Sequence, residues 1–333
     1  MARRPPPDEF EIIRRYFVPL AKGHPGARGL TDDVATLALA PGRELVITAD
    51  AIVAGVHFLP GDPADAIARK MLRVNLSDLA AKGAVAIGYL MTIAAPASIG
   101  EDWLESFARG LAADQAEFGV TLLGGDTTAT PGPLTLSVTA VGEIAAGATL
   151  HRDGAKAGDA VFVSGTLGDG ALGLAVARGG LTNLPESLRN ALLDRYRVPR
   201  PRMTLGPRLI GIAHAALDVS DGLVADLGHI CECSGLRAVV DAASVPLSEA
   251  AARALAEDGS LRSRILAGGD DYEILFTAPE DSAAALARLA GELEVPITRI
   301  GRMVEGTGVT VLDSQGRPIP LSHEGYRHFA GPG

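Results

Sequence analysis

The chain has 333 residues, of which 47% are hydrophobic, and its formal net charge is −10. This length and apolar content are enough for two domains with separate cores. The acidic balance argues against a nucleic-acid-binding protein, because the sequence has no run of Lys and Arg longer than a short pair such as Arg3-Arg4. The first residues lack the apolar segment of a signal peptide, and no apolar stretch reaches the length of about 18 residues that spans a membrane. We therefore expect a cytoplasmic protein with no membrane partner.

The first half of the chain mixes predicted helices and strands. Apolar residues recur at helical spacing after Asp8, which predicts a helix over 8–20, and the Gly- and Asp-rich stretch 21–33 predicts a loop. The next elements, in chain order, are a strand over 44–50, a helix over 64–83, a helix over 101–118, a strand over 120–123 and a strand over 134–144.

After residue 150 the pattern starts again, which indicates a boundary between two domains, 1–150 and 151–333. Both halves combine strands with helices, so the fold class is α/β, arranged in α+β layers. The elements expected in the second half are a strand over 160–164, a helix over 169–178, helices within 186–215, a strand over 216–219, a helix over 222–234, a strand over 237–241, a helix near 248–257, a strand over 272–277, a helix over 281–292 and strands over 295–300 and 308–313.

Carboxylates gather where predicted strands end. Asp50, Asp126 and Asp218 close or follow such strands, and ligands of α/β proteins bind at strand ends. Alone, these carboxylates would repel a triphosphate, whereas Mg²⁺ takes oxygen ligands and bridges carboxylates to phosphate oxygens. Each Asp by itself is more simply a cap or turn residue, and Ser220 or Asp221 suits the cap of the helix that follows. Only the set as a whole predicts a metal–phosphate site.

The stretch Gly168-Asp-Gly-Ala-Leu-Gly173 fits the pattern G-x-G-x-x-G between a predicted strand and a predicted helix. In that context the pattern is typical of a dinucleotide site, but the acidic partner expected about 20 residues later is ambiguous, with Glu186 the nearest. A packed turn or a general anion site is the simpler interpretation. The chain has no G-x-x-x-x-G-K-[ST] motif, which argues against a P-loop kinase.

Seven short motifs occur in order along nearly the whole chain. Each is weak by itself, and the ordered set is specific. They are Thr48-Ala-Asp50, Val53-Ala-Gly-Val-His-Phe-Leu-Pro60, Asn75-Leu-Ser-Asp-Leu-Ala-Ala-Lys-Gly83, Gly124-Gly-Asp-Thr-Thr128, Asp218-Val-Ser-Asp-Gly-Leu223, Gly268-Gly-Asp-Asp-Tyr-Glu273 and Gly325-Tyr-Arg-His-Phe329.

This ordered set resembles the thiamine-monophosphate kinases. The resemblance implies a two-domain fold of the aminoimidazole-ribotide-synthetase type, whose N-terminal sheet pairs with that of a second subunit in a homodimer. It implies an enzyme that binds ATP and several Mg²⁺ ions, chiefly with its N-terminal domain. The implied reaction transfers the γ-phosphoryl group of ATP directly to thiamine monophosphate and gives thiamine pyrophosphate, the last step of that cofactor's biosynthesis.

The resemblance also implies roles for particular residues. Asp126 and Asp218 would be central to catalysis, through the metal. His57, Asp270 and Tyr326 would contact thiamine monophosphate, the last as an aromatic face against a heteroaromatic cation. ATP would contact Gly125, Asp126, Arg152 and Ser220, and Mg²⁺ would be held by Asp33, Thr48, Asp50, Asp78, Asp126, Asp218 and Asp221.

Three positions depart from the family's pattern. Leu30-Thr-Asp-Asp33 stands where the family often has Gly-Asp-Asp, Ala49 replaces a common hydroxyl residue, and Asp270 replaces a common Glu. None removes a carboxylate from the core set. The alternatives are another enzyme of the same superfamily, a non-catalytic binding protein for a thiamine phosphate or a nucleotide, and a dinucleotide-dependent dehydrogenase.

Overall fold

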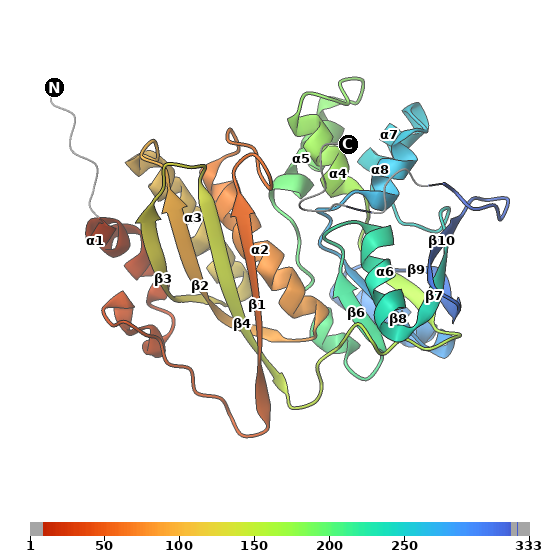
Figure 1. Ribbon diagram of the computed structural model, residues 1–333, viewed down its shortest axis with the longest axis horizontal. Coiled ribbons are helices and arrows are strands. Elements are labelled where there is room, and N and C mark those ends of the chain that lie inside the picture. Colours follow the sequence, from red (N-terminus) through yellow and green to blue (C-terminus); the bar gives the residue numbers. More distant parts are fainter. Residues whose placement is uncertain (1–8, 321–324, 326–333) are drawn as a thin grey trace. The chain divides into compact units, whose positions relative to one another are not determined.

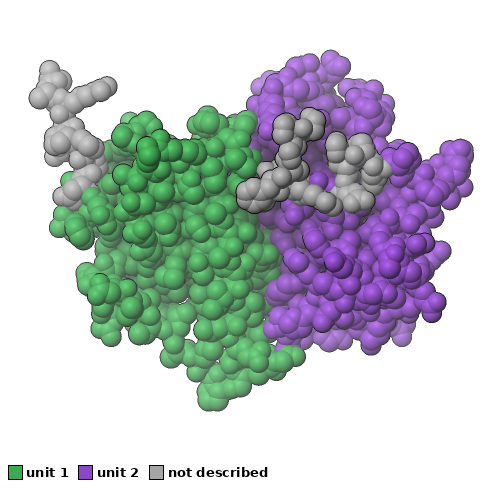
Figure 2. Space-filling view, in the orientation of Figure 1, with its two compact units in different colours: residues 1–79, 84–147 green, residues 80–83, 148–333 purple. Residues whose placement is uncertain are grey.

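The computed structural model describes residues 9–320 and Gly325. It divides into two compact units, coloured green and purple in Figure 2. Unit 1 comprises residues 1–79 and 84–147, and unit 2 comprises residues 80–83 and 148–333. Each unit has a β-sheet of its own, with four strands in unit 1 and six in unit 2.

The sheet of unit 1 has the strand order β1-β4-β2-β3. β2 and β3 are parallel, and the other neighbours are antiparallel. Helices α2 and α3 cover one face of this sheet (Figure 1), and Gln115 of α3 donates to the buried Tyr89 hydroxyl of β2 at 3.1 Å. The bounds are β1 Arg43–Val53, α2 Ala64–Ala81, β2 Val85–Ala95, α3 Glu101–Phe118, β3 Thr121–Ala129 and β4 Thr135–Ala145.

The covered face is built by alternation. Along β4, Leu136, Val138 and Ala140 are buried, whereas Ser137 and Thr139 between them are partly exposed. Successive side chains of a strand point to opposite faces of the sheet, so the apolar residues form the core with α2 and α3.

The other face of the same sheet carries large apolar side chains that nothing within the described part of unit 1 buries. Leu45 and Val85 both pair with Glu143, so they share one row of the sheet. Leu45, Ile47, Val85 and Leu90 are 42%, 60%, 51% and 41% exposed. Contiguous exposed apolar residues mark an interaction surface, here called the open face.

The N-terminal segment is helical, as expected, but irregular. α1 (Glu9–Ile12) continues into a π-helix (Ile13–Phe17) and a 3₁₀-helix (Val18–Ala21), and a second 3₁₀ segment follows at Pro25–Leu30. Strand β2 was absent from the sequence expectations. Asp50 and Asp126 lie inside β1 and β3, which corrects their placement at strand ends. The strands are longer than the apolar runs that predicted them, because sheet pairing extends over the polar residues that follow.

The sheet of unit 2 has the strand order β10-β7-β9-β5-β8-β6. Only β10 and β7 are parallel neighbours, and every other neighbouring pair is antiparallel. All five residues of the central strand β5 are buried. The bounds are β5 Ala160–Ser164, β6 Ala215–Asp218, β7 Leu236–Asp241, β8 Ile274–Ala278, β9 Ile297–Glu305 and β10 Gly308–Leu312.

The helices of unit 2 form separate layers around that sheet. α6 packs on the sheet through Leu223, Leu227 and Ile230, and α4, α5, α7 and α8 form a helical cluster with its own core (Figure 1). No helix among residues 9–320 has the length and apolar character to cross a bilayer. The bounds are α4 Asp169–Ala177, α5 Glu186–Arg197, a 3₁₀-helix Gly206–Leu209, α6 Leu223–Ser234, α7 Glu249–Glu257, α8 Leu261–Ala267, a 3₁₀-helix Glu280–Ser282 and α9 Ala283–Leu293.

Candidate active site

Thr48 and Asp50 project from the same side of β1, because side chains two residues apart in a strand share a face. That side meets α2. Thr48 Oγ1 donates to Asp78 Oδ2 at 2.6 Å, and the backbone N–H of Asp50 donates to Asn75 Oδ1 at 3.0 Å. Asn75 and Asp78 are three residues apart and therefore lie on one side of the helix. Strand and helix together bring a hydroxyl and two carboxylates into one neighbourhood.

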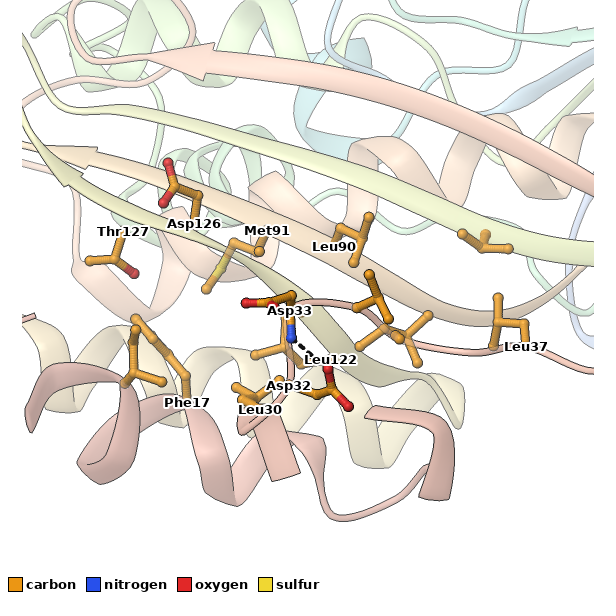
Figure 3. A pocket seen from close by; sticks show the side chains of 17 residues that line it. Phe17, Leu30, Asp32, Asp33, Leu37, Leu90, Met91, Leu122, Asp126 and Thr127 are labelled. Carbon is orange, nitrogen blue, oxygen red and sulfur yellow. Dashed lines mark hydrogen bonds between the residues drawn. The ribbon is translucent and has the colours of Figure 1, made fainter. Parts of the chain in front are cut away.

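Asp33 and Asp126 line a pocket of about 520 Å³ within unit 1, and Figure 3 shows both side chains beside it. The N–H of Asp33 donates to Asp32 Oδ1 at 2.9 Å, which fixes the loop locally. Apolar side chains, among them Phe17 and Met91, form most of the remaining wall. An apolar wall with carboxylates at its edge suits a ligand that has a flat apolar part and a metal-bound anionic part.

Gly125 places Asp126 by allowing β3 to approach β2 closely. Its φ is 152°, and a Cβ atom there would lie 1.7 Å from the carbonyl oxygen of Met91. Only glycine satisfies both conditions without moving the backbone. The motif therefore needs glycine here to fit the sheet, whatever ligand it contacts.

His57 sits in a tight turn directly after β1. Its Nδ1 accepts the backbone N–H of Val53 at 3.0 Å, and its carbonyl oxygen accepts Lys70 Nζ at 3.0 Å. Because Nδ1 is an acceptor, the neutral ring carries its proton on Nε2. The side chain therefore presents a hydrogen-bond donor from a fixed backbone.

In unit 2, β6 ends at Asp218 and α6 begins at Leu223. Oδ2 of Asp226, in the first turn of α6, accepts the backbone N–H groups of Asp221 and Gly222, both at 3.0 Å. The expectation that Ser220 or Asp221 caps α6 is wrong, because the N-cap is Gly222 and no side chain caps from that position. The N–H groups of Asp221 and Gly222 are instead satisfied by Asp226, a side chain of the helix itself.

Asp226 is buried, and groups of the 218–222 turn influence its pKa. Burial raises the pKa of Asp226 to about 7, and the neighbouring Asp221 carboxylate adds to the rise. The N–H groups of Asp221 and Gly222 and the positive charge of Arg152 oppose it. Arg152, whose carbonyl oxygen accepts Ser234 Oγ at 3.1 Å, therefore lies within electrostatic range of the 218–222 turn.

The turn 218–222 and the segment 268–273 are joined by their backbones. Asp270 N–H donates to Ser220 O at 2.9 Å, Tyr272 N–H donates to Val219 O at 2.8 Å, and Val219 N–H donates to Glu273 O at 2.9 Å. Two motifs that lie about fifty residues apart in the chain thus form one rigid pair in space, here called the paired loops.

Comparison with known proteins identifies the family of this chain. Residues 31–144 match the family model of the AIR synthase related protein, N-terminal domain, and residues 156–314 match that of the C-terminal domain. A relative from Caulobacter vibrioides, "Thiamine-monophosphate kinase", is 46% identical over 97% of this chain and 91% of its own. The chain belongs to the thiamine-monophosphate kinase family. The expected fold class is confirmed by the same matches.

Solved structures of thiamine-monophosphate kinases superpose on this chain. The crystal structure of the kinase from Stenotrophomonas maltophilia K279a has a TM-score of 0.80 at 45% identity and covers 87% of this chain and 91% of its own. The structure of AaThiL complexed with AMPPCP and TMP has a TM-score of 0.77 at 31% identity and covers 90% of this chain and 91% of its own.

In this chain, the G-x-G-x-x-G motif has a packing role. Gly168 has a φ of 87°, a Cβ on Gly170 would lie 2.3 Å from Asp270 O, and a Cβ on Gly173 would lie 2.2 Å from Leu192 O. β5, which precedes the motif, is antiparallel to both its neighbours, whereas dinucleotide folds place the motif after a parallel strand. The packed-turn interpretation is the one that the structure supports.

The site residues expected of this kinase family are divided between the two units, and within unit 1 Asp50 and Asp126 lie on the two opposite edge strands, β1 and β3. Asp218, Ser220, Asp221 and Asp270 lie on the paired loops of unit 2, with Arg152 nearby. Between residues 9 and 320, no three His, Cys, Asp or Glu side chains come close enough together to hold a metal ion. The assigned metal ligands therefore stay a prediction, and Tyr326 lies outside the described residues. Unit 1 carries Asp33, Thr48, Asp50, His57, Asp78, Gly125 and Asp126.

The sequence analysis did not identify several residues that support the candidate site. Asn75 belongs to a recognised motif, but the motif does not reveal that it holds the backbone of Asp50. Asp226 follows Gly222 by four residues, a spacing that brings a helical side chain back to its own N-terminus, so it could have been found. The sequence shows Asp271 and Glu273 only as members of the motif Gly268-Gly-Asp-Asp-Tyr-Glu273, and their burial is apparent only in the structure.

Proposed function

We propose that this protein transfers the γ-phosphoryl group of ATP to thiamine monophosphate and produces thiamine pyrophosphate. Support comes from 46% identity along 97% of the chain to a relative named for this activity, and from a 31% identical structure in complex with AMPPCP and TMP. Direct transfer is supported by the backbone hydrogen bonds between the paired loops. These bonds connect the loop that we propose to hold nucleotide and metal to the loop that we propose to hold the acceptor.

We propose Mg²⁺ as the metal, and the oxygens of the site fit it. Mg²⁺ prefers hard oxygen ligands and is bound through one or two carboxylates together with substrate phosphates. The Thr48 hydroxyl and the Asp78 carboxylate already meet at 2.6 Å, and Asp33 and Asp126 line one pocket. When bound, Mg²⁺ would neutralise the phosphate charge that two anionic reactants bring together. The proposed ligands are Asp33, Thr48, Asp50, Asp78, Asp126, Asp218 and Asp221.

The residues of the chain then act mainly by positioning. Gly125, Asp126, Arg152 and Ser220 hold ATP, and Arg152 adds positive charge beside the phosphates. The acceptor phosphate is largely ionised near neutral pH, since the second pKa of a phosphate monoester is about 6. No protein group has to remove a proton before the attack, which agrees with the absence of a general base from the proposed roles.

The acceptor is proposed to contact His57, Asp270 and Tyr326. His57 offers a donor at Nε2, and the Asp270 carboxylate offers an acceptor and a negative charge. Thiamine monophosphate carries an amino group on its pyrimidine ring and a positive charge on its thiazolium ring. These groups complement a carboxylate and an aromatic face.

We further propose a cytoplasmic homodimer that forms through the open face. Leu45, Ile47, Val85 and Leu90 would be buried against the same residues of a second copy, as a two-fold interface requires. We assign dimerisation, and chiefly ATP and metal binding, to residues 1–150 on the same proposal. No nucleic acid or membrane partner is proposed, in keeping with the net charge of −10.

The deciding experiment measures ADP release from Mg²⁺-ATP with thiamine monophosphate, free thiamine and the aminoimidazole-ribotide precursor as separate acceptors. Release with thiamine monophosphate alone, with thiamine pyrophosphate identified as the product, is the expected result. Turnover with a different acceptor would overturn the substrate. Tight nucleotide binding without turnover of any acceptor would instead favour a binding protein.

A further inference from the structure

The segment 268–273 has an unusual backbone where it carries its acidic residues. Asp270 has a φ of 71° and Tyr272 a φ of 54°, in the left-handed region that residues other than glycine rarely adopt. Such conformations are strained and persist only where the surroundings enforce them. In this backbone conformation, Tyr272 Oη donates to Asp270 Oδ1 at 3.1 Å, and both side chains are partly exposed.

Asp271, between these two residues, points into the protein instead. It is 2% exposed. Its Oδ2 accepts Gly168 N–H at 2.7 Å, and its Oδ1 accepts Gly170 N–H at 3.0 Å. These N–H groups belong to the N-terminus of α4, a helix of nine residues, where the helix dipole also favours an acidic group. The N–H groups that G-x-G-x-x-G could have offered to an external ligand are thus occupied by the chain's own Asp271 carboxyl group.

Further contacts fix the segment against α4, α5 and β5. A Cβ on Gly170 would lie 2.3 Å from Asp270 O, so the helix and the segment touch backbone to backbone. Arg195 Nη2 reaches Asp271 O at 3.3 Å and Glu273 Oε1 at 3.0 Å. Glu273, which is fully buried, also accepts Ser164 Oγ at 2.6 Å. Inward-pointing residues therefore hold the segment, whereas Asp270 and Tyr272 remain partly exposed.

We propose that Asp271 is a positioning residue of the acceptor site. By capping α4 it maintains the left-handed conformations of Asp270 and Tyr272, and so it sets the orientation of the Asp270 carboxylate toward thiamine monophosphate. This inference rests on the proposed function. Asp271 itself does not touch the acceptor and takes no part in the chemistry.

The test compares Asp271→Asn with Asp159→Asn. Asparagine keeps the shape but presents one oxygen instead of two, so one of the two N–H groups of α4 loses its acceptor. Asp159 is a matched control because it is buried and accepts the Lys156 N–H at 2.8 Å. It directly precedes β5, at the end of that strand that lies away from the segment 268–273. For both variants, KM for thiamine monophosphate, KM for ATP, kcat and the thermal unfolding midpoint are measured.

We expect Asp271→Asn to raise KM for thiamine monophosphate by roughly tenfold or more, with a change in KM for ATP that is several times smaller. Asp159→Asn should lower the unfolding midpoint without changing either KM. An unchanged acceptor KM in active Asp271→Asn, or an equal rise in both KM values, would overturn the positioning role alone. A wild-type protein that does not turn over thiamine monophosphate would overturn the proposed function and this inference with it.

A second pair of variants keeps the test decisive if Asp271→Asn does not fold. Gly170→Ala and Gly173→Ala introduce the same methyl group into α4, with similar clashes of 2.3 Å and 2.2 Å against Asp270 O and Leu192 O. Only the first clash displaces the acceptor segment. A rise in acceptor KM for Gly170→Ala but not for Gly173→Ala supports the proposal, whereas equal behaviour of the two contradicts it.

Discussion

The hydroxyl of Thr48 donates a 2.6 Å hydrogen bond to the carboxylate of Asp78, joining β1 to α2. Replacing Thr48 with Val keeps the shape and removes the hydroxyl. Because the hydroxyl orients a proposed metal ligand, the Mg²⁺ concentration for half-maximal turnover should rise roughly tenfold. A titration of activity with Mg²⁺ measures this. Thr48→Ser retains the hydroxyl and should behave like the wild type, and a Val variant that matches it would remove Thr48 from the site.

Asp218 ends β6 at the start of the paired loops. Asp218→Asn should reduce kcat by a factor of about 100 or more, which corresponds to roughly 3 kcal/mol of transition-state stabilisation, with a much smaller loss of folding stability. Asp241, which ends β7 and accepts the Ala243 N–H at 2.9 Å, provides the control. Asp241→Asn should remain active in the same ADP-release assay. Near-normal turnover of Asp218→Asn would contradict the metal role.

Gly125→Ala should destabilise unit 1 strongly. The new Cβ would lie 1.7 Å from Met91 O at a φ of 152°, so strands β2 and β3 have to separate, at a cost of more than about 3 kcal/mol. Gly124 provides a control, since a Cβ there meets only the Leu90 side chain at 3.3 Å. Urea unfolding of the two variants should show the difference, and equal stability would mean that the two strands are not held this closely.

Ile47→Asp should convert the proposed homodimer to monomers, because it places a charge in the middle of the open face. Analytical ultracentrifugation across a range of concentrations measures the change. Val56 is also exposed, at 50%, but lies in the turn after β1, so Val56→Asp should leave the dimer intact. A wild-type chain that sediments as a monomer would rule out the proposed interface.

The stability of unit 2 should depend on pH through Asp271. Burial raises the pKa of Asp271 to about 8, and the N–H groups of Gly168 and Gly170 oppose the rise. In the unfolded chain the same carboxyl has a pKa near 3.9. The folded state therefore holds a proton that the unfolded state releases, so this group's contribution is fully present below about pH 4 and is lost as pH rises through about 8.

Urea unfolding at pH 5 and pH 8 separates this contribution from the others. The stability of the wild type relative to Asp271→Asn should fall between the two pH values, since asparagine does not titrate. An unchanged difference would show that the folded-state pKa is not raised.

Much of the fold was predictable because local signals agreed with tertiary packing. The spacing of Trp103, Leu104, Phe107 and Leu111 predicted a helix over 101–118, and α3 spans those residues. β2 was missed because Val85–Ala95 carries Gly88 and apolar residues on both faces, which gives no clear alternation. Its exposed Val85 and Leu90 make sense only when the open face of the sheet is known.

The candidate site also contains residues that the sequence predicts and residues that it does not. The motifs identified the residues expected to meet ligands, such as Asp126 and Asp270, because these stand in short, distinctive stretches. The residues that support them, such as Asn75 and Asp271, act through hydrogen bonds to backbone groups far away in the chain. A single sequence contains no signal for contacts of this kind.

The backbone bonds of the paired loops limit how acceptor preference can be changed. Because Asp270 and Tyr272 are hydrogen-bonded to Ser220 and Val219, a loop graft that replaces 268–273 alone would carry a strand edge shaped for a different neighbour. Altering the acceptor by design, or by divergence within the family, therefore requires both segments to be exchanged as one block, together with the start of α4 on which the second segment rests.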